Sequence, residues 1–224
     1  MQVEKTKIVF LDFCGTCVPF QSADKFVFFV AANYATLAVR FRSVLLKILM
    51  YLRLVKRIER WSKYRITSKK LILSQLKGLN ESVMEEAAKQ YFIQIIKPSL
   101  IPEIYDEIKK KQKEGFRIVV VSGGYDIYIK YFMEYIGGNM SDVLATPLIF
   151  VNEKFTGKMG LDCMAEAKIT YIQKYFNKKD IYSVAYSDSL SDTPLFNFAD
   201  EAHIIAQLPD SLKKKKIMTM YYYE

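Results

Sequence analysis

The stretch that decides the fold is IVFLDFCGT, residues Ile8–Thr16. An apolar run ends at Asp12 and passes at once into a Gly-Thr turn. In open α/β sheets, ligands bind just beyond the carboxyl ends of the strands. Because a lone acid is rarely buried without a partner, Asp12 is predicted to be a nucleophile, a metal ligand, or both.

The remainder of the chain alternates strand and helix patterns around this first strand, Lys7–Leu11. Later strands are expected at Arg117–Val121, Ile181–Ala185 and His203–Ala206, and a hairpin at Leu148–Val151 and Phe155–Thr156. Helices are expected at Ile101–Glu114, Tyr125–Ile136, Cys163–Phe176 and Asp192–Phe198. Such alternation predicts an α/β fold, with a parallel sheet covered by helices on both faces.

A long helical segment, Ser22–Lys97, separates the first two predicted strands. It has no proline, only one glycine, and apolar residues at helical spacing that continue through Leu52 and Val55. Pro98 ends it. We therefore predict two domains: an α/β core formed by residues 1–21 and 98–224, and an all-helical cap formed by residues 22–97.

Composition places limits on the class of protein. The chain has 224 residues, of which 51% are hydrophobic, so it can bury a full core and is not a disordered chain. Its three cysteines are too few for a disulfide scaffold and indicate a reducing compartment. The first apolar run is too short for a signal peptide. Together these features predict a cytoplasmic protein.

The positive charge of the chain is concentrated in the predicted cap. Between Phe26 and Lys77 there are twelve Lys or Arg residues and a single acid, Glu59, so this segment carries +11 while the whole chain carries +9. A field of this sign attracts anions such as phosphorylated substrates or anionic lipids. No motif for RNA or DNA binding is present, and nucleic acid is not an expected partner.

Polar side chains follow the predicted strands or begin the helices after them. Ser122 and Gly123 follow the second strand, where a hydroxyl and backbone N–H groups can bind an anion. Asp188 and Asp192 follow a later strand. Because the carboxyl ends of parallel strands meet at one edge, these acids and Asp12 are expected to converge, and converging carboxylates need a cation. With oxygen ligands and a phosphate, Mg²⁺ is the simplest choice.

These motifs resemble those of the haloacid dehalogenase-like superfamily of phosphohydrolases. They are DFCGT at Asp12–Thr16, VVVSGG at Val119–Gly124, Lys168 within EAKITYI, and YSDSLSDTPLF at Tyr186–Phe196. The chain looks most similar to the phosphoserine-phosphatase-like branch, subfamily IB. That resemblance implies a three-layer, Rossmann-like parallel sheet with a helical cap inserted after the first motif.

The resemblance also implies roles for individual residues. Asp12 would attack phosphorus and form an aspartyl-phosphate. The Asp12 carboxylate, the Cys14 main-chain carbonyl and Asp188 would bind Mg²⁺, with Asp192 supporting them. Ser122 and the Gly123 N–H would bind phosphoryl oxygens, and Lys168 would orient Asp12 and offset negative charge. The predicted function is Mg²⁺-dependent hydrolysis of a small phosphorylated, anionic substrate.

Cys14 departs from the family pattern, which usually has a second Asp at this position. In the family that carboxyl group protonates the leaving oxygen and then activates water, a contribution of about 10²–10⁴-fold. A thiol, whose ordinary pKa is about 8.5, can donate a proton but is a poor substitute for a carboxylate base. Slow turnover, a long-lived phosphoenzyme, transfer to another acceptor, or phosphate binding without catalysis are the alternatives. The main-chain metal contact at Cys14 does not depend on its side chain.

Other interpretations of the same residues remain open at this stage. Cys14 and Cys17 form a C-x-x-C pair, the spacing of redox pairs and of half a zinc site. The stretch Phe26–Val39 is uncharged but only about 14 residues long, shorter than the ~20 that a membrane-spanning helix needs. A cap helix packed on its neighbours is favoured. The alternative is a peripheral contact of the basic cap with the inner membrane surface, where the protein would hydrolyse a lipid phosphate. Within the cap, substrate contacts are sought at Asp24, Arg40 and Arg42. The oligomeric state is not predicted.

Overall fold

The computed structural model of the protein describes residues 5–51, 68–207 and 215–220. Its centre is a sheet in the strand order β3-β2-β1-β6-β7-β8. The strands are β1 (Thr6–Leu11), β2 (Arg117–Tyr125), β3 (Val143–Thr146), β6 (Ile181–Ser187), β7 (Glu201–Gln207) and β8 (Lys215–Met220). The first five strands in this order pair in parallel, as predicted, and β8 is antiparallel to β7.

Alternate residues of β1 face two different helical layers. Val9 and Leu11 belong to a buried cluster with α6 (Pro102–Lys113) and α7 (Asp126–Tyr135). Ile8 and Phe10 belong to a second cluster with α8 (Glu166–Gln173) and α9 (Thr193–Phe198). This two-sided burial follows from the period of two along a strand. It confirms the three-layer α/β fold.

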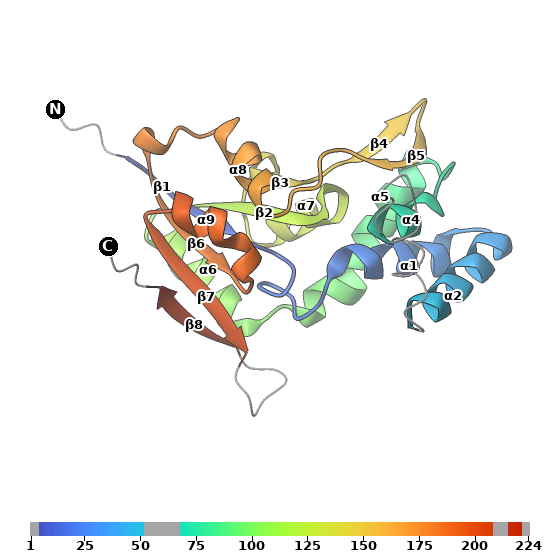
Figure 1. Ribbon diagram of the computed structural model, residues 1–224, viewed down its shortest axis with the longest axis horizontal. Helices are drawn as coiled ribbons and strands as arrows, with labels where there is room; N and C mark the ends of the chain where they lie inside the picture. The colour runs from blue at the N-terminus through green and yellow to red at the C-terminus, as the bar shows by residue number, and fades with distance from the viewer. Residues whose placement is uncertain (1–4, 52–67, 208–214, 221–224) are drawn as a thin grey trace.

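The segment from Ser22 to β2 is mostly helical where it is described. It contains α1 (Ser22–Tyr34), α2 (Leu37–Tyr51), α4 (Ser68–Ser74) and α5 (Glu81–Tyr91), which continues through a π-turn, η1 (Phe92–Ile96), and a 3₁₀ turn, η2 (Lys97–Ser99). Figure 1 shows these helices grouped beside the sheet, with α2 at the end of the molecule. Part of the predicted insert, including Leu52 and Val55, lies outside the described residues, as do six of its basic residues: Arg53, Lys56, Arg57, Arg60, Lys63 and Arg65.

A hairpin joins the helical insert to the core. It consists of β4 (Leu148–Val151) and β5 (Lys154–Met159) and forms a separate two-stranded sheet. Its backbone pairs with the turn after α4, because Gly78 donates to the Phe155 carbonyl at 2.8 Å and Phe155 donates to the Leu79 carbonyl at 2.8 Å. Figure 1 shows the hairpin reaching across to α4 and α5. The division of the chain into a core and an all-helical cap remains a prediction.

The structure differs from the sequence predictions at several elements. Strand β3 was not predicted, because four residues give too little pattern to distinguish a strand from a loop. Strand β8 was not predicted either. On sequence alone, the lysine run Lys213–Lys216 indicates a solvated tail, yet its last two residues begin an edge strand, where lysine is common. Lys213, Lys214 and the run Tyr221–Tyr223 lie outside the described residues.

Three helix boundaries also shift. Strand β2 extends to Tyr125, which was expected to begin a helix. Helix α8 begins only at Glu166, after Ala165 adopts a positive φ of 47°. The last helix is preceded by the 3₁₀ turn η5 (Leu190–Asp192) and starts at Thr193. In the described part of the chain, no helix is both long and apolar enough to cross a membrane.

Candidate active site

Asp12 stands at the carboxyl end of β1, the central position of the sheet. Its backbone N–H donates to the Tyr186 carbonyl of β6 at 2.9 Å, and its side chain is buried. The chain then turns sharply at Gly15, whose φ is +83°. This turn brings the Thr16 hydroxyl back to within 3.1 Å of Asp12 Oδ2. The turn therefore fixes one oxygen of the carboxylate.

Thr16 also connects Asp12 to Asp188, which follows β6. The Thr16 hydroxyl lies 3.4 Å from Asp188 Oδ1, and the Asp188 N–H donates to Thr16 Oγ1 at 3.0 Å. A Cβ on Gly15 would lie only 2.1 Å from Asp188 Oδ2. The absence of a side chain at Gly15 therefore lets the Asp188 carboxylate lie directly against this turn.

Lys168 of α8 is buried between two acids. Its Nζ lies 2.7 Å from Asp12 Oδ1 and 2.5 Å from Asp192 Oδ2, and its side chain is 3% exposed. Asp192 also accepts a hydrogen bond from Ser187 at 2.6 Å. Burial raises the pKa of Asp12, and Lys168 opposes that rise. Burial alone would lower the pKa of Lys168, but the two carboxylates outweigh it and the pKa is raised. Lys168 is thus held as a cation.

Ser122 and Gly123, near the end of β2, line the same cavity. The Ser122 Oγ accepts a hydrogen bond from the Gly124 N–H at 3.0 Å. A Cβ on Gly123 would lie 2.6 Å from the Met164 side chain, so glycine keeps this wall close to the loop before α8. The cavity has a volume of about 390 Å³. It is lined by every site residue predicted from the sequence: Asp12, Cys14, Ser122, Gly123, Lys168, Asp188 and Asp192.

Comparison with known proteins agrees with this arrangement. The sequence model of the haloacid dehalogenase-like hydrolase family matches residues 9–197. The chain belongs to this family of hydrolases. None of the curated protein sequences matches the chain.

Solved structures of the same fold include phosphoserine phosphatases. A phospho-aspartyl intermediate analogue of phosphoserine phosphatase is 23% identical over 89% of this chain and 86% of its own, with a TM-score of 0.52. A phosphoserine phosphohydrolase-like protein from Francisella tularensis is 16% identical over 88% and 86%, with a TM-score of 0.59. A protein of unknown function from Bordetella pertussis Tohama I is 18% identical over 89% of each chain, with a TM-score of 0.70. These similarities establish the fold of this hydrolase-family member.

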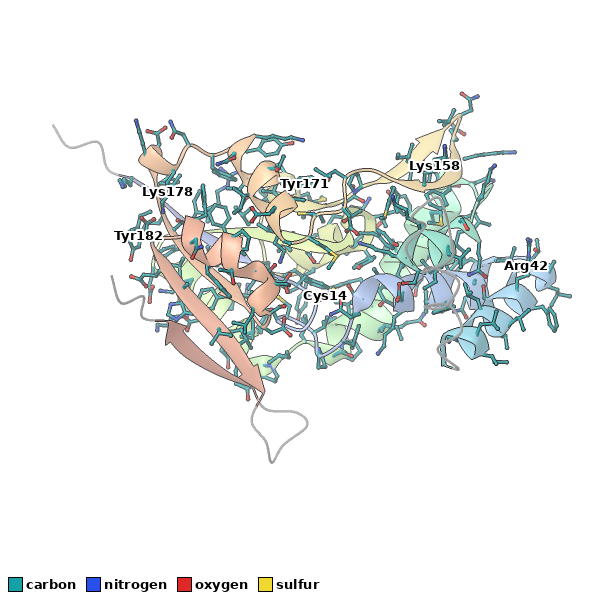
Figure 2. The ribbon with its side chains drawn as sticks, in the orientation of Figure 1. Cys14, Arg42, Lys158, Tyr171, Lys178 and Tyr182 are labelled. Atoms are coloured by element: carbon teal, nitrogen blue, oxygen red, sulfur yellow. The ribbon has the colours of Figure 1, made fainter. Side chains whose placement is uncertain are left out.

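Cys14 lines the cavity where the core meets the insert (Figure 2). Its Sγ lies 2.9 Å from the Ser22 hydroxyl and accepts a longer hydrogen bond, 3.4 Å, from the Ser22 N–H. Ser22 in turn lies 2.6 Å from the Tyr128 hydroxyl, and its carbonyl accepts from the Tyr91 hydroxyl at 2.9 Å. Burial, and then the charge of Asp12, raise the pKa of the Cys14 thiol. The thiol is therefore held protonated within a buried hydroxyl network.

The neighbouring cysteine points elsewhere. Cys17 is buried and its thiol donates to the Asp12 carbonyl at 3.3 Å. All three cysteines are free thiols. Among the residues that the structure describes, no three His, Cys, Asp or Glu side chains converge in a way that would hold a metal ion. The zinc interpretation of the C-x-x-C pair thus has no support in the described part of the chain.

The donor set nevertheless fits Mg²⁺. The expected ligands are two carboxylates and one main-chain carbonyl. Such a site needs only two acidic side chains, so it does not depend on three His, Cys, Asp or Glu side chains coming together. Asp12 and Asp188 share the hydroxyl of Thr16, and the Asp188 carboxylate lies against Gly15, the residue after the Cys14 carbonyl. Hard oxygen donors of this kind are the ones that Mg²⁺ prefers. The assignment of these ligands, and of every catalytic role, remains a prediction.

Lys69 was not identified from the sequence. It comes from α4 of the insert, and its Nζ lies 2.5 Å from the Gly123 carbonyl and 2.6 Å from Asp162 Oδ1. Asp162 is held in turn by the Thr146 hydroxyl at 3.0 Å. Lys69 and Gly123 are about 50 residues apart in the sequence, so only the folded structure reveals their contact. Helical spacing alone does not say which face of α4 meets the core. Lys69 ties the insert to the end of β2, where Ser122 and Gly123 are predicted to bind phosphate.

The predicted substrate contacts in the insert divide into two groups. Asp24 lines the cavity, where burial raises its pKa and Lys69 opposes that rise. Arg40 and Arg42 lie on the exposed face of α2 and do not line the cavity. Thr16, Ser22, Tyr128 and Ser187 are further residues whose contacts the sequence did not predict.

Proposed function

We propose that this chain is a Mg²⁺-dependent phosphomonoester hydrolase that carries the phosphoryl group on Asp12. One observation supports this above all others. The Asp12 carboxylate faces a cavity of about 390 Å³ with Lys168 on one of its oxygens at 2.7 Å and the Thr16 hydroxyl on the other at 3.1 Å. A buried carboxylate oriented in this way is suited to attack a phosphate that enters the cavity.

In the first step, a carboxylate oxygen of Asp12 would attack phosphorus and the bond to the leaving oxygen would break. The leaving oxygen would take the proton of the Cys14 thiol. In the second step, water would attack the phosphorus of the aspartyl-phosphate and the bond to Asp12 would break. The proton of that water would return to the Cys14 thiolate, which restores the starting state and releases inorganic phosphate.

The remaining residues would act on charge and orientation. Ser122 and the Gly123 N–H would bind phosphoryl oxygens, and Lys168 would keep Asp12 in place. Bound by Asp12, the Cys14 carbonyl and Asp188, with Asp192 in support, Mg²⁺ would neutralise charge on the phosphoryl group. The substrate is proposed to be a small phosphorylated anion, and the protein is proposed to be cytoplasmic.

A second candidate function rests on Cys14 alone. The family pattern has a carboxyl group where this chain has a thiol, and a thiol serves poorly as the base of the second step. A phosphoenzyme that persists, or that passes its phosphoryl group to an acceptor other than water, is the alternative. So is a protein that binds phosphate without turnover.

The deciding experiment measures hydrolysis of an aryl phosphate and of an alkyl phosphate under reducing conditions, with and without Mg²⁺. An aryl leaving group needs no acid, so the native chain should release it in a burst, followed by slow turnover. Asp12→Asn should abolish the burst. Cys14→Asp should raise the steady rate by about 10²–10⁴-fold, the usual contribution of a general acid–base.

Cys17→Ser is the matched control, because Cys17 is a thiol in the same loop that does not line the cavity. It should leave both phases unchanged. A native chain that shows no burst, together with an inactive Cys14→Asp variant that still folds, would exclude the proposed reaction. A burst without turnover would favour the phosphotransfer alternative.

A further inference from the structure

Helix α2 presents an unusual surface for a helix of a folded domain. Five large apolar side chains on it are about half exposed or more: Leu37 (80%), Phe41 (73%), Val44 (55%), Leu45 (48%) and Ile48 (50%). Monomeric proteins rarely expose contiguous apolar patches without a binding role. We call these five residues the α2 stripe.

The α2 stripe occupies one side of the helix. At 3.6 residues per turn, its five members fall within an arc of about 100°. The residues that pack on the protein are Val39, Ser43 and Leu46, which lie on the opposite side of the helix. Ser43 anchors that side by donating to Gln75 at 2.9 Å. The stripe therefore points away from the rest of the insert.

Basic residues flank the α2 stripe on both sides. On the same helical wheel, Arg40 and Lys47 fall along one edge and Arg42 along the other, and all three are exposed. Between Leu37 and Tyr51 there is no acidic residue. Figure 2 shows Arg42 at the end of the insert, away from Cys14. An apolar face bordered by cations is the pattern of a helix that lies in the plane of a membrane.

We infer that α2 docks the insert onto an anionic lipid bilayer. The stripe would enter the boundary between headgroups and acyl chains, and the flanking cations would contact anionic headgroups. From Leu37 to Ile48 the stripe is about 16 Å long, enough to lie on a bilayer and too short to span one. A second copy of the chain fits less well, because two such helices would bring their flanking cations together. This surface is independent of the reaction proposed above.

The test is flotation with vesicles of phosphatidylcholine, with and without phosphatidylserine, at low salt. The native chain should float with the phosphatidylserine vesicles and be released as salt increases. Leu37→Ser/Phe41→Ser should weaken binding by about tenfold or more, since it removes two apolar side chains from the lipid contact. Arg42→Gln should weaken it by about fivefold.

Two variants serve as matched controls. Tyr175→Ser removes an aromatic side chain that is 68% exposed on the core, and Lys113→Gln removes an exposed cation at the end of α6. Both should bind like the native chain, and circular dichroism should show that every variant is folded. A native chain that stays unbound, that binds neutral vesicles equally well, or whose double variant floats unchanged overturns the inference. So does a concentration-dependent dimer that forms without vesicle binding and is lost in Leu37→Ser/Phe41→Ser.

Discussion

The cation between Asp12 and Asp192 should contribute strongly to stability. Lys168→Met keeps most of the apolar stem and removes only the ammonium group. It leaves two buried carboxylates, each less than 10% exposed, without their shared partner. Removing one member of a buried ion pair costs about 3–5 kcal/mol. Because both acids line a cavity that water can enter and keep their hydroxyl donors Thr16 and Ser187, we expect a loss near 3 kcal/mol in the free energy of unfolding.

The matched control is Lys178→Met. Lys178 makes an equally short contact, 2.6 Å, with Asp200, but the two side chains are 38% and 27% exposed. An exposed pair of this kind contributes only about 0–1 kcal/mol. The comparison therefore keeps the residue type and the contact distance nearly constant, while the burial and the number of acids contacted, two for Lys168 and one for Lys178, differ.

Urea unfolding followed by circular dichroism, in the presence of a chelator, measures both variants. Adding Mg²⁺ should restore part of the loss in Lys168→Met, since a cation that binds only the folded state stabilises it, and should not affect Lys178→Met. Lys168→Met should also lose the phosphatase activity. Equal destabilisation by the two variants would refute the idea that burial makes the Asp12–Lys168–Asp192 cluster important for stability.

Three further changes test other parts of the structure. Gly15→Ala should abolish activity, because a Cβ would lie 2.1 Å from Asp188 Oδ2. Gly78 has a φ of +90°, but a Cβ there would meet no atom within 4 Å. Gly78→Ala should therefore cost only about 1–2 kcal/mol of stability and leave activity intact. Burial raises the pKa of Asp126 from 3.8 to about 6, so the folded state holds this proton more tightly than the unfolded chain does. The free energy of unfolding should then fall as the pH rises from about 4 to about 6. Asp126→Asn should remove about 1–2 kcal/mol of that fall, after allowance for the partial exposure of the side chain, when unfolding is measured across this pH range. Lys69→Met should raise KM and have a smaller effect on the free energy of unfolding. A KM equal to that of the native chain in steady-state assays would contradict a role for Lys69 at the cavity.

The order of the motifs explains why so much of the site could be predicted. Asp12 and Asp188 each follow a strand of one parallel sheet, Ser122 lies near the end of another, and such strands end at the same edge. Their convergence is therefore a consequence of topology, which the alternation of patterns reveals. Lys168 required the family resemblance, since one lysine in a helix carries no signal of its own.

The residues that were missed depend on contacts between distant segments. Lys69 reaches Gly123 from the insert, and Ser22 connects Cys14 to Tyr128. Nothing in the local pattern specifies which helix face meets the cavity. The uncharged stretch Phe26–Val39 shows the same difficulty. The part of it that belongs to α1 packs against neighbouring elements, whereas the exposed apolar side chains lie mostly further along the chain, on α2.

The surroundings of Cys14 explain how a single substitution could change the reaction without changing the site. The Ser22 N–H donates to the Sγ atom and the Ser22 hydroxyl lies 2.9 Å from it, and both groups can donate to a carboxylate in its place. A carboxylate there would add negative charge beside Asp12, whose pKa burial already raises. Lys168 and a bound Mg²⁺ would oppose that charge. The thiol therefore lowers the electrostatic cost of a buried nucleophile while weakening the base that the second step needs, and the steady rate of Cys14→Asp measures which of these effects is larger.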